Sequence, residues 1–327
     1  MEAIEVELVL RTSGADPAGV VRPAGIDTRS IPAQGFLYES VTDLFDPENA
    51  ISQGYVEVTV TEGPGAVGFG VVELQELDAV IGIQAQEGDG GVSITGSRSE
   101  ELFSAQLASE LGVIYTSLNL INTGQAQRSV TLTAIAEDGS NLADPVDLSL
   151  APGEQLSRDA GDLFDVAAAA LAPQGGAPFV GSLRVLVDGP GVRGDVIFGD
   201  PLSLEYAASL PLQREGFRKA VFSQVANVAG FFTGVAAYVP GDTEANVEIT
   251  VFGADGEMVG EPYTETLAPG TRRSMLVPEL VPASAGQAGG YVLICSDELL
   301  IAQILYGAVG QGRVTLLSAV PPTVIEN

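Results

Sequence analysis

Short stretches in which apolar and polar residues alternate recur along the chain. Residues 247–251 read Val-Glu-Ile-Thr-Val, which is the period of two expected for a strand with one buried face. Asp255-Gly256 follows, and this pair suits a tight turn with a positive φ. A short apolar run predicts another strand at residues 231–239, and strands separated by turn signals are predicted to follow at 272–276, 291–295, 299–306 and 313–317.

A similar succession of strands is predicted earlier in the chain, at residues 114–121, 130–135, 183–187 and 194–198. Seven or eight short strands in about 105 residues is typical of a β-sandwich. A parallel α/β sheet would need long helical segments between its strands, and the sequence shows none. We therefore predict an all-β fold.

The chain also repeats itself. Leu150-Ala151-Pro152-Gly153 recurs 117 residues later as Leu267-Ala268-Pro269-Gly270, and at the same offset Thr116 meets Thr233. Self-similarity at a fixed spacing is the signature of repeated structural units. Two full copies of one unit are therefore predicted.

A shorter copy precedes these two. Residues 31–45 align without gaps to residues 150–164, and Gly63-Pro64-Gly65 matches Gly189-Pro190-Gly191. This copy lacks about 25 residues at its start, the part equivalent to residues 103–128. Such a loss uncovers an apolar face and two strand edges. Three explanations are open: the chain is part of a longer protein, a neighbouring molecule donates the strands, or the first unit is a smaller, rearranged fold.

The prediction is thus an all-β chain of tandem antiparallel β-sandwich repeats, with the first copy incomplete at its N-terminus. Its parts are an incomplete first repeat at 1–86, a linker at 87–102, a second repeat at 103–213, a short junction at 214–221, and a third repeat with a short tail at 222–327. The linker is polar and rich in Gly and Ser, with one short strand predicted at 92–95. The short junction implies less freedom between the second and third units.

One short helix is predicted within the second repeat. It begins at Asp162, which can cap it, continues through an alanine-rich run to Leu171, and stops before Pro173. An acid recurs at the start of this insert in each copy, as Asp43, Asp162 and Glu279. Helix capping explains that recurrence without a catalytic role.

The residue types that are missing exclude several chemistries. The chain has no histidine, no tryptophan and one cysteine, Cys295. Ser-His and Cys-His nucleophilic catalysis in their usual forms are therefore excluded, as are imidazole metal sites and an internal disulfide. Cys295 lies in an apolar, strand-like run and is predicted to be a small buried hydrophobe. A reactive nucleophile would need a base that the sequence does not supply.

The charge balance excludes two classes of partner. The chain has 43 acidic and 14 basic residues, for a net charge of −29, which argues against binding to nucleic acid and to anionic membrane surfaces. No apolar run reaches about 18 residues, so no membrane insertion is predicted. Residues 2–7 carry acids where a signal peptide needs basic residues. Either the chain is intracellular or its true N-terminus lies upstream.

Three motifs are best explained as turns. Asp138-Gly139-Ser140-Asn141 with Asp144 offers oxygen ligands for calcium but lacks the spacing of an EF loop, so a plain turn is predicted. Gly63-Pro64-Gly65 and Gly189-Pro190-Gly191 lack the Lys-Ser/Thr ending of a phosphate loop and lie between strand-like runs. Hairpins are predicted there, with Asp297-Glu298 as the corresponding turn of the third copy.

The order of these signals resembles a known type of protein. Each full copy opens with Phe-Ser, at Phe103 and Phe222, and continues with a strand, an Asn-x-Gly or Pro-Gly-Asp turn, a second strand, Asp-Gly and Leu-Ala-Pro-Gly. This order is similar to that of tandem β-sandwich modules, immunoglobulin-like or fibronectin-like, of bacterial secreted or surface proteins. The resemblance implies a sandwich fold without an assigned activity, and it carries over no functional residue.

We therefore predict a non-catalytic structural, adhesion or assembly module of a bacterial extracellular or cell-surface protein, with polymerisation by strand exchange as one form of assembly. No catalytic residue, metal ligand or cofactor is predicted, and the expected partners are proteins, including copies of the chain itself. A first alternative is a glycan- or ligand-binding module that uses the loops between strands; exposed Tyr or Phe repeated in both full copies would favour it. A second is a carboxylate-based hydrolase, which two acids close together in a cleft would favour.

Overall fold

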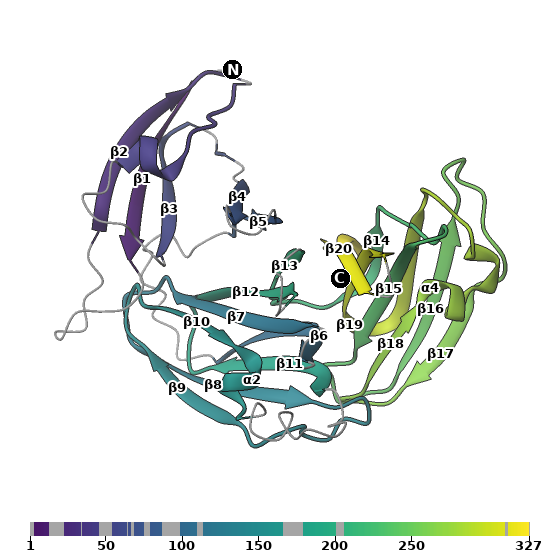
Figure 1. The fold of residues 1–327 in the computed structure, drawn as a ribbon. Helices are drawn as coiled ribbons and strands as arrows, with labels where there is room; N and C mark the ends of the chain where they lie inside the picture. Colours follow the sequence, from purple (N-terminus) through teal and green to yellow (C-terminus); the bar gives the residue numbers. More distant parts are fainter. Residues whose placement is uncertain are drawn as a thin grey trace.

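The computed structural model consists almost entirely of antiparallel β-strands, which confirms the predicted all-β fold class (Figure 1). The structure describes residues 3–12, 23–33, 35–45, 54–63, 65–66, 69–74, 79–86, 99–109, 114–165, 179–200, 206–310 and 313–326. The strands fall into three groups along an arc, which we call the first, second and third units. The residue limits predicted for the repeats stay predictions, and the strand predicted at 92–95 lies outside the described residues.

The first unit holds a three-stranded sheet in the order β2-β1-β3 and a two-stranded sheet of β4 and β5. Its elements are β1 (Ile4–Thr12), β2 (Pro23–Ile31), α1 (Val41–Phe45), β3 (Gly54–Glu62), β4 (Phe69–Leu74) and β5 (Ala79–Gln84). Residues 35–40 lead into α1 without regular secondary structure.

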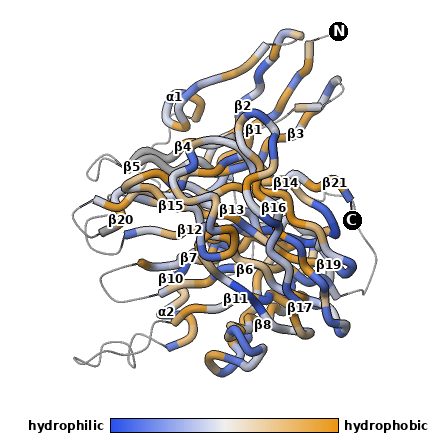
Figure 2. Tube along the Cα trace, turned by 90° about the vertical axis from the view of Figure 1, so that its right-hand side faces the viewer, coloured by the Kyte–Doolittle hydropathy of each residue, from blue (hydrophilic) through white to orange (hydrophobic). Residues whose placement is uncertain are grey.

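The second unit is a pair of four-stranded sheets, β6-β11-β8-β9 and β10-β7-β12-β13. Its elements are β6 (Glu100–Ser109), β7 (Tyr115–Asn122), β8 (Arg128–Ile135), β9 (Val146–Leu150), β10 (Gln155–Asp159), α2 (Ala160–Leu163), β11 (Phe179–Val187), β12 (Val192–Gly199) and β13 (Ala207–Pro211). Buried and partly buried residues alternate along β7, and hydrophobic and hydrophilic stretches are mixed along the chain (Figure 2). Leu120, Leu132 and Val185, from both sheets, are fully buried in one apolar cluster. The two sheets therefore pack face to face as a sandwich.

The third unit has two layers that share one long strand. One layer has the order β17-β16-β19-β14-β21, and in the other β18 pairs with β15, β15 with β19, and β19 with β20. Its elements are β14 (Phe217–Phe222), β15 (Phe231–Tyr238), β16 (Ala245–Phe252), β17 (Tyr263–Leu267), β18 (Arg272–Leu276), α4 (Val277–Leu280), η1 (Pro282–Ser284), β19 (Tyr291–Gly310), β20 (Arg313–Val320) and β21 (Thr323–Glu326).

The sheets of the second and third units have the same strand order. β9-β8-β11-β6 corresponds to β17-β16-β19-β14, and β10-β7-β12-β13 corresponds to β18-β15-β19-β20. Thr116 Oγ1 donates to the carbonyl of Ala108 at 2.6 Å, and Thr233 Oγ1 donates to that of Ala226 at 3.2 Å. In the first unit β2-β1-β3 corresponds to β9-β8-β11, and β4-β5 to β12-β13. No described strand of that unit corresponds to β6 or β7.

The short helices correct the predicted cap. α2 begins at Ala160, and its N-cap is Asp159, whose carboxylate accepts from the backbone N–H of Gly161 at 2.7 Å. Asp162 is therefore not the cap but the third helical residue, as Asp43 is in α1 and Glu279 in α4. Acids at this position are favourable because unpaired N–H groups and the helix dipole make the N-terminus positive. The predicted alanine-rich continuation at 166–171 lies outside the described residues.

The predicted hairpins at the Gly-Pro-Gly motifs are wrong. Gly189-Pro190-Gly191 joins β11 to β12, which belong to different sheets, and β3 and β4, on either side of the first motif, likewise belong to different sheets. Asp297-Glu298 forms no turn, since both lie inside β19. The first half of β19 pairs with β14 and β16 and the second half with β15 and β20. One bent strand thus passes from one layer of the sandwich to the other, as strands do at sandwich corners.

Candidate functional site

The most elaborate surface in the described residues is the contact between the second and third units. In β6, Leu102 and Leu107 belong to the core of the second unit, whereas Phe103 and Ala105 contact the third unit. A register shift in the pairing with β11 between Ser104 and Leu107 separates the two sets. We call the shared group the joint cluster; it consists of Phe103, Ala105 and Ile135 from the second unit and Ala236, Tyr238 and Ile301 from the third. The rings of Phe103 and Tyr238 meet with centroids 5.9 Å apart. The parts of β6, β8, β15 and β19 that hold these residues are therefore buried on both faces. In an isolated sandwich the outer face of each strand would be exposed to water.

Polar side chains connect the same two units. Gln213 Nε2 donates to the carbonyl of Ala302 at 2.9 Å, and Ser104 Oγ donates to Gln303 Oε1 at 3.1 Å. Both contacts lie beside the joint cluster, because Ser104 and Gln303 neighbour cluster members in β6 and β19. Directional bonds next to an apolar cluster fix the relative rotation of the two units.

Arg272 places a positive charge in this contact. Arg272 is 3% exposed. Its Nη2 donates a hydrogen bond to Gln106 Oε1, and its backbone N–H donates to the carbonyl of Glu137 at 3.2 Å. Burial lowers the pKa of Arg272 to about 10, so the guanidinium stays charged at neutral pH. A buried charge is tolerated only where its polar neighbours keep their places, and Arg272 therefore penalises other arrangements of the two units.

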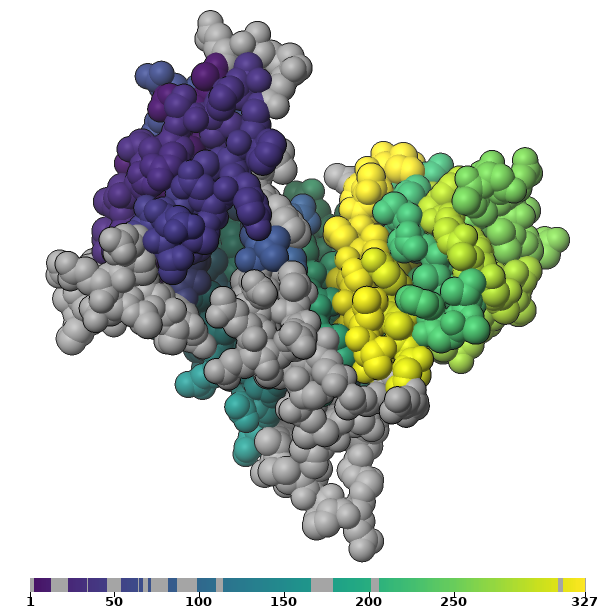
Figure 3. Space-filling view, turned by 45° about the horizontal axis from the view of Figure 1, so that its top comes forward, coloured from purple at the N-terminus to yellow at the C-terminus, as the bar shows by residue number. Residues whose placement is uncertain are grey.

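The apolar interior also runs from one unit into the next. Leu317 of β20 is a buried member of the core cluster of the second unit. β20 contacts β13, and β13 in turn contacts β5, so corresponding strands of the three units lie in series near the centre of the arc (Figure 1). In the space-filling view a hollow separates the first unit from the third (Figure 3). The second unit is thus the element that both others contact.

One hydrogen bond of the joint recurs between the first and second units. Gln86 Nε2 donates to the carbonyl of Gly194 at 2.9 Å, as Gln213 does to that of Ala302. Each glutamine lies two residues after the last paired residue of its strand, β5 or β13. Each acceptor lies in the corresponding strand of the following unit, β12 or the second half of β19. The units are therefore joined in the same manner at both places.

Tyr55 makes a second contact at the first of these joints. Its hydroxyl donates to the carbonyl of Gly153 at 3.1 Å, and burial raises the pKa of Tyr55 to about 12. Replacing Tyr55 by Phe is expected to lower the opening free energy of β1–β3 by about 0.5–1.5 kcal/mol, measured by native-state hydrogen exchange. Tyr38, which is 84% exposed, is the control, and Tyr38→Phe should leave exchange unchanged. Equal effects of the two substitutions would contradict the assignment.

Asp195 lies next to Gly194 and is partly buried. Burial raises the pKa of its carboxyl group, while a 2.7 Å hydrogen bond from Asn119 Nδ2 opposes that rise. In the folded chain this group holds its proton to higher pH than in the unfolded chain. Stability therefore falls as pH rises from the ordinary value of 3.8 through the folded-state pKa.

Replacing Asp195 by Asn should raise the unfolding midpoint of the second unit at pH 7, because the neutral amide removes a partly buried charge. The gain should shrink towards pH 3, where both states of the wild-type chain are protonated. Asp138, which is exposed and whose pKa is lowered by hydrogen bonds from Ser140, is the control. Asp138→Asn should bring no gain at pH 7. Thermal unfolding followed by circular dichroism measures both, and a lower midpoint for Asp195→Asn would refute the prediction.

Two carboxylates meet two tyrosines at one end of the second unit. Burial raises the pKa of both Tyr115 and Tyr206; the charges of Asp159 and Asp200 raise that of Tyr115 further, and the charge of Asp200 raises that of Tyr206. The spacing of these acids in the sequence gave no signal of this cluster. Asp159 is engaged in capping α2, and the corresponding N-cap of α4 is Leu276. The pair therefore does not recur, which gives no support to a repeated hydrolase site.

Exposed aromatic rings do not recur either. Among the described side chains the strongly exposed ones are Phe36 and Tyr38 in the first unit, at 87% and 84%, and Phe231 in the third, at 45%. An exposed ring repeated in the second and third units would favour the glycan-binding alternative. No described side chain of the second unit supplies such a ring.

The remaining motifs fall in structural positions. Asp138 accepts from the N–H and the hydroxyl of Ser140, and Gly139 has a φ of 85°, so this motif is a tight turn. Cys295 lies in β19 and is partly rather than fully buried, and burial raises the pKa of its thiol. Among the described residues no cluster of His, Cys, Asp or Glu has the composition of a metal site. No described helix has the length and hydrophobicity to cross a membrane.

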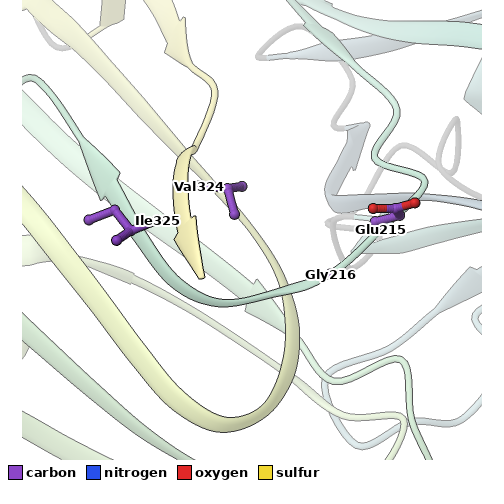
Figure 4. Close-up of a pocket in the computed structure, with 4 residues that line it drawn as sticks. All are labelled: Glu215, Gly216, Val324 and Ile325. Atoms are coloured by element: carbon purple, nitrogen blue, oxygen red, sulfur yellow. The ribbon is translucent and has the colours of Figure 1, made fainter. Parts of the chain in front are cut away.

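A shallow depression lies where β21 passes the segment between the second and third units (Figure 4). It is lined by Glu215, Gly216, Val324 and Ile325. Val324 and Ile325 extend from opposite sides of β21 (Figure 4) and are 45% and 58% exposed. One carboxylate beside aliphatic side chains does not form a catalytic or ligand-binding constellation.

Comparisons with known proteins add little to this geometry. No family model matches the sequence, and no curated protein matches it. A protein of Thermotoga maritima aligns with 34% of this chain and 97% of its own, at 17% identity and a TM-score of 0.31. A candidate secreted protein of Parabacteroides distasonis aligns with 76% of this chain and 83% of its own, at 10% identity and a TM-score of 0.19. β-Glucuronidase of Ruminococcus gnavus aligns with 73% of this chain and 39% of its own, at 11% identity and a TM-score of 0.14. Likenesses this low carry no inference about function.

Proposed function

We propose that the chain is a non-catalytic structural module of a bacterial extracellular or cell-surface protein, in which β-sandwich units are held end to end at fixed angles. Spacing, adhesion and assembly all need such a stiff array. The observation that carries the proposal is the apolar interior that continues from the second unit into the third, through the joint cluster and Leu317. The hydrogen bond that recurs at both joints supports it.

The distribution of polar chemistry supports a role without catalysis. Among the polar groups described above, Arg272 and Gln303 serve contacts between units, and Asp159 caps a helix. Enzymes instead gather perturbed titratable groups in one pocket. The proposed role accordingly requires no cofactor.

Small-angle X-ray scattering of the full chain tests the stiffness that this function needs. The net charge of −29 would spread loosely linked units apart at low salt, whereas fixed joints resist that repulsion. We expect the same radius of gyration at about 0.05 M and about 1 M sodium chloride. A radius that shrinks steadily as salt is added would overturn the proposal.

A further inference from the structure

In the described part of the first unit, one edge of β3 and the side chain of Val58 are exposed, whereas their counterparts in the second unit, β11 and Val185, are covered. Among the described residues β3 pairs with β1 alone, whereas the corresponding β11 pairs with both β8 and β6. Val58 pairs with Leu8 as Val185 pairs with Leu132. Val58 is nevertheless 51% exposed, and Val185 is fully buried. The layer that covers Val185 therefore has no counterpart over Val58 in the described part of the chain.

A second uncovered edge lies on the other side of the same unit. Residues 35–40 precede α1 as β10 precedes α2, and β10 pairs with β7. No described strand pairs with residues 35–40, and β4 pairs with β5 alone, whereas β12 pairs with β7 as well as β13. Phe36 and Tyr38 are consequently exposed. Among the described residues two strand positions are therefore open: one beside β3, and one between residues 35–40 and β4.

The charge at the first position indicates what fits there. Arg184, just before Val185 in β11, forms an ion pair with Glu101 of the neighbouring β6. Glu57 holds the same place before Val58; it forms an ion pair with Arg11 of β1 at 2.9 Å, and its side chain stays 48% exposed. The polarity is thus reversed, and a strand beside β3 matches Glu57 with a basic residue. The chain's own β6 begins with two glutamates, so a second copy would bring like charges together.

We propose that the first unit accepts two extended segments of a different polypeptide in the places that β6 and β7 hold in the second unit. The donor carries apolar residues at alternate positions over Val58 and a basic residue opposite Glu57. Backbone hydrogen bonds along β3 provide affinity, and the alternating side chains provide specificity. This inference rests on the proposed structural function and names the class of its partner.

The test uses the full chain and a synthetic peptide with the sequence of residues 99–122 in which Glu101 is replaced by Lys. Calorimetry should show that this peptide binds about fivefold more tightly than the unmodified peptide. In the Glu57→Lys chain the preference should reverse. Hydrogen exchange should show new protection in β3, β4 and residues 35–40, and in no strand of the other units. Val58→Asp should abolish binding.

Three results would overturn the proposal. They are the absence of binding by either peptide, protection outside the first unit, and a concentration-dependent oligomer of the chain alone in which β3 is already protected. The last result would make a second copy the occupant. The first two leave the scattering of the unliganded chain unchanged, and the third is recognised by its dependence on protein concentration, so failure here is distinguishable from failure of the structural function.

Discussion

Replacing Ile301 by Asp is expected to uncouple the second and third units. Ile301 is fully buried in the joint cluster, and a carboxylate there has no basic partner within the cluster. An unpaired buried charge costs about 3–5 kcal/mol. Because the cost falls on the contact and not on either core, the two units should unfold separately. Differential scanning calorimetry should then show two transitions where the wild-type chain shows one for this pair.

Leu299→Asp is the matched control for that experiment. Leu299 lies two residues away in the same strand and is 40% exposed. Its replacement should change stability by about 0.5 kcal/mol or less and leave the units coupled. If Ile301→Asp left the transitions merged, the joint cluster would not be what couples the units.

The second large effect is expected from an Asp substitution at Val185, with the same substitution at Val58 as its control. They hold corresponding places in β11 and β3, but only Val185 is fully buried. Val185→Asp should cost more than about 4 kcal/mol and unfold the second unit, since a carboxylate would lie in the apolar core. Val58→Asp should cost about 0.5 kcal/mol or less, because half of that side chain already faces water. Urea denaturation followed by circular dichroism measures both.

A similar loss from both substitutions would contradict the open edge of the first unit. It would mean that Val58 lies in a covered core like that of the second unit. If the Val58→Asp chain is stable, as expected, it can also be used in the peptide-binding test of the donor proposal.

The sequence predicted strands well where one face meets the core and the other meets water. The strand predicted at 272–276 is β18, and the run around Val247 is β16. Residues 245–249 of β16 have the period of two that a half-buried strand imposes, whereas β18 does not show it. The acid that recurs at Asp43, Asp162 and Glu279 was also correctly linked to a helix start, although at the third helical position.

The sequence pattern did not predict the connections between sheets. A glycine-rich segment between two strands has the same local chemistry whether the chain folds back in one sheet or crosses to another. Gly189-Pro190-Gly191 makes such a crossing, and in the third unit Asp297-Glu298 crosses without any turn. The pairing of distant strands decides between these outcomes, and periodicity does not report it.

The joint between units was missed because its residues occupy positions that alternation assigns to solvent. Ala236 and Tyr238 lie on the opposite face of β15 from Val235 and Ala237, which belong to the core of the third unit. The available signal was a strand with apolar residues on both faces, which indicates burial on both sides. Arg272 gave no signal, since arginine at an edge strand is ordinarily exposed.

Residual dipolar couplings of backbone amides in the full chain test the central claim most directly, because they report the relative orientation of the units in solution. If the second and third units form one stiff body, one alignment tensor should fit the amides of β6–β13 and β14–β21 together. The Ile301→Asp chain should require two tensors. Two tensors of different magnitude in the wild-type chain would show units that move independently, and would contradict a structural role built on fixed joints.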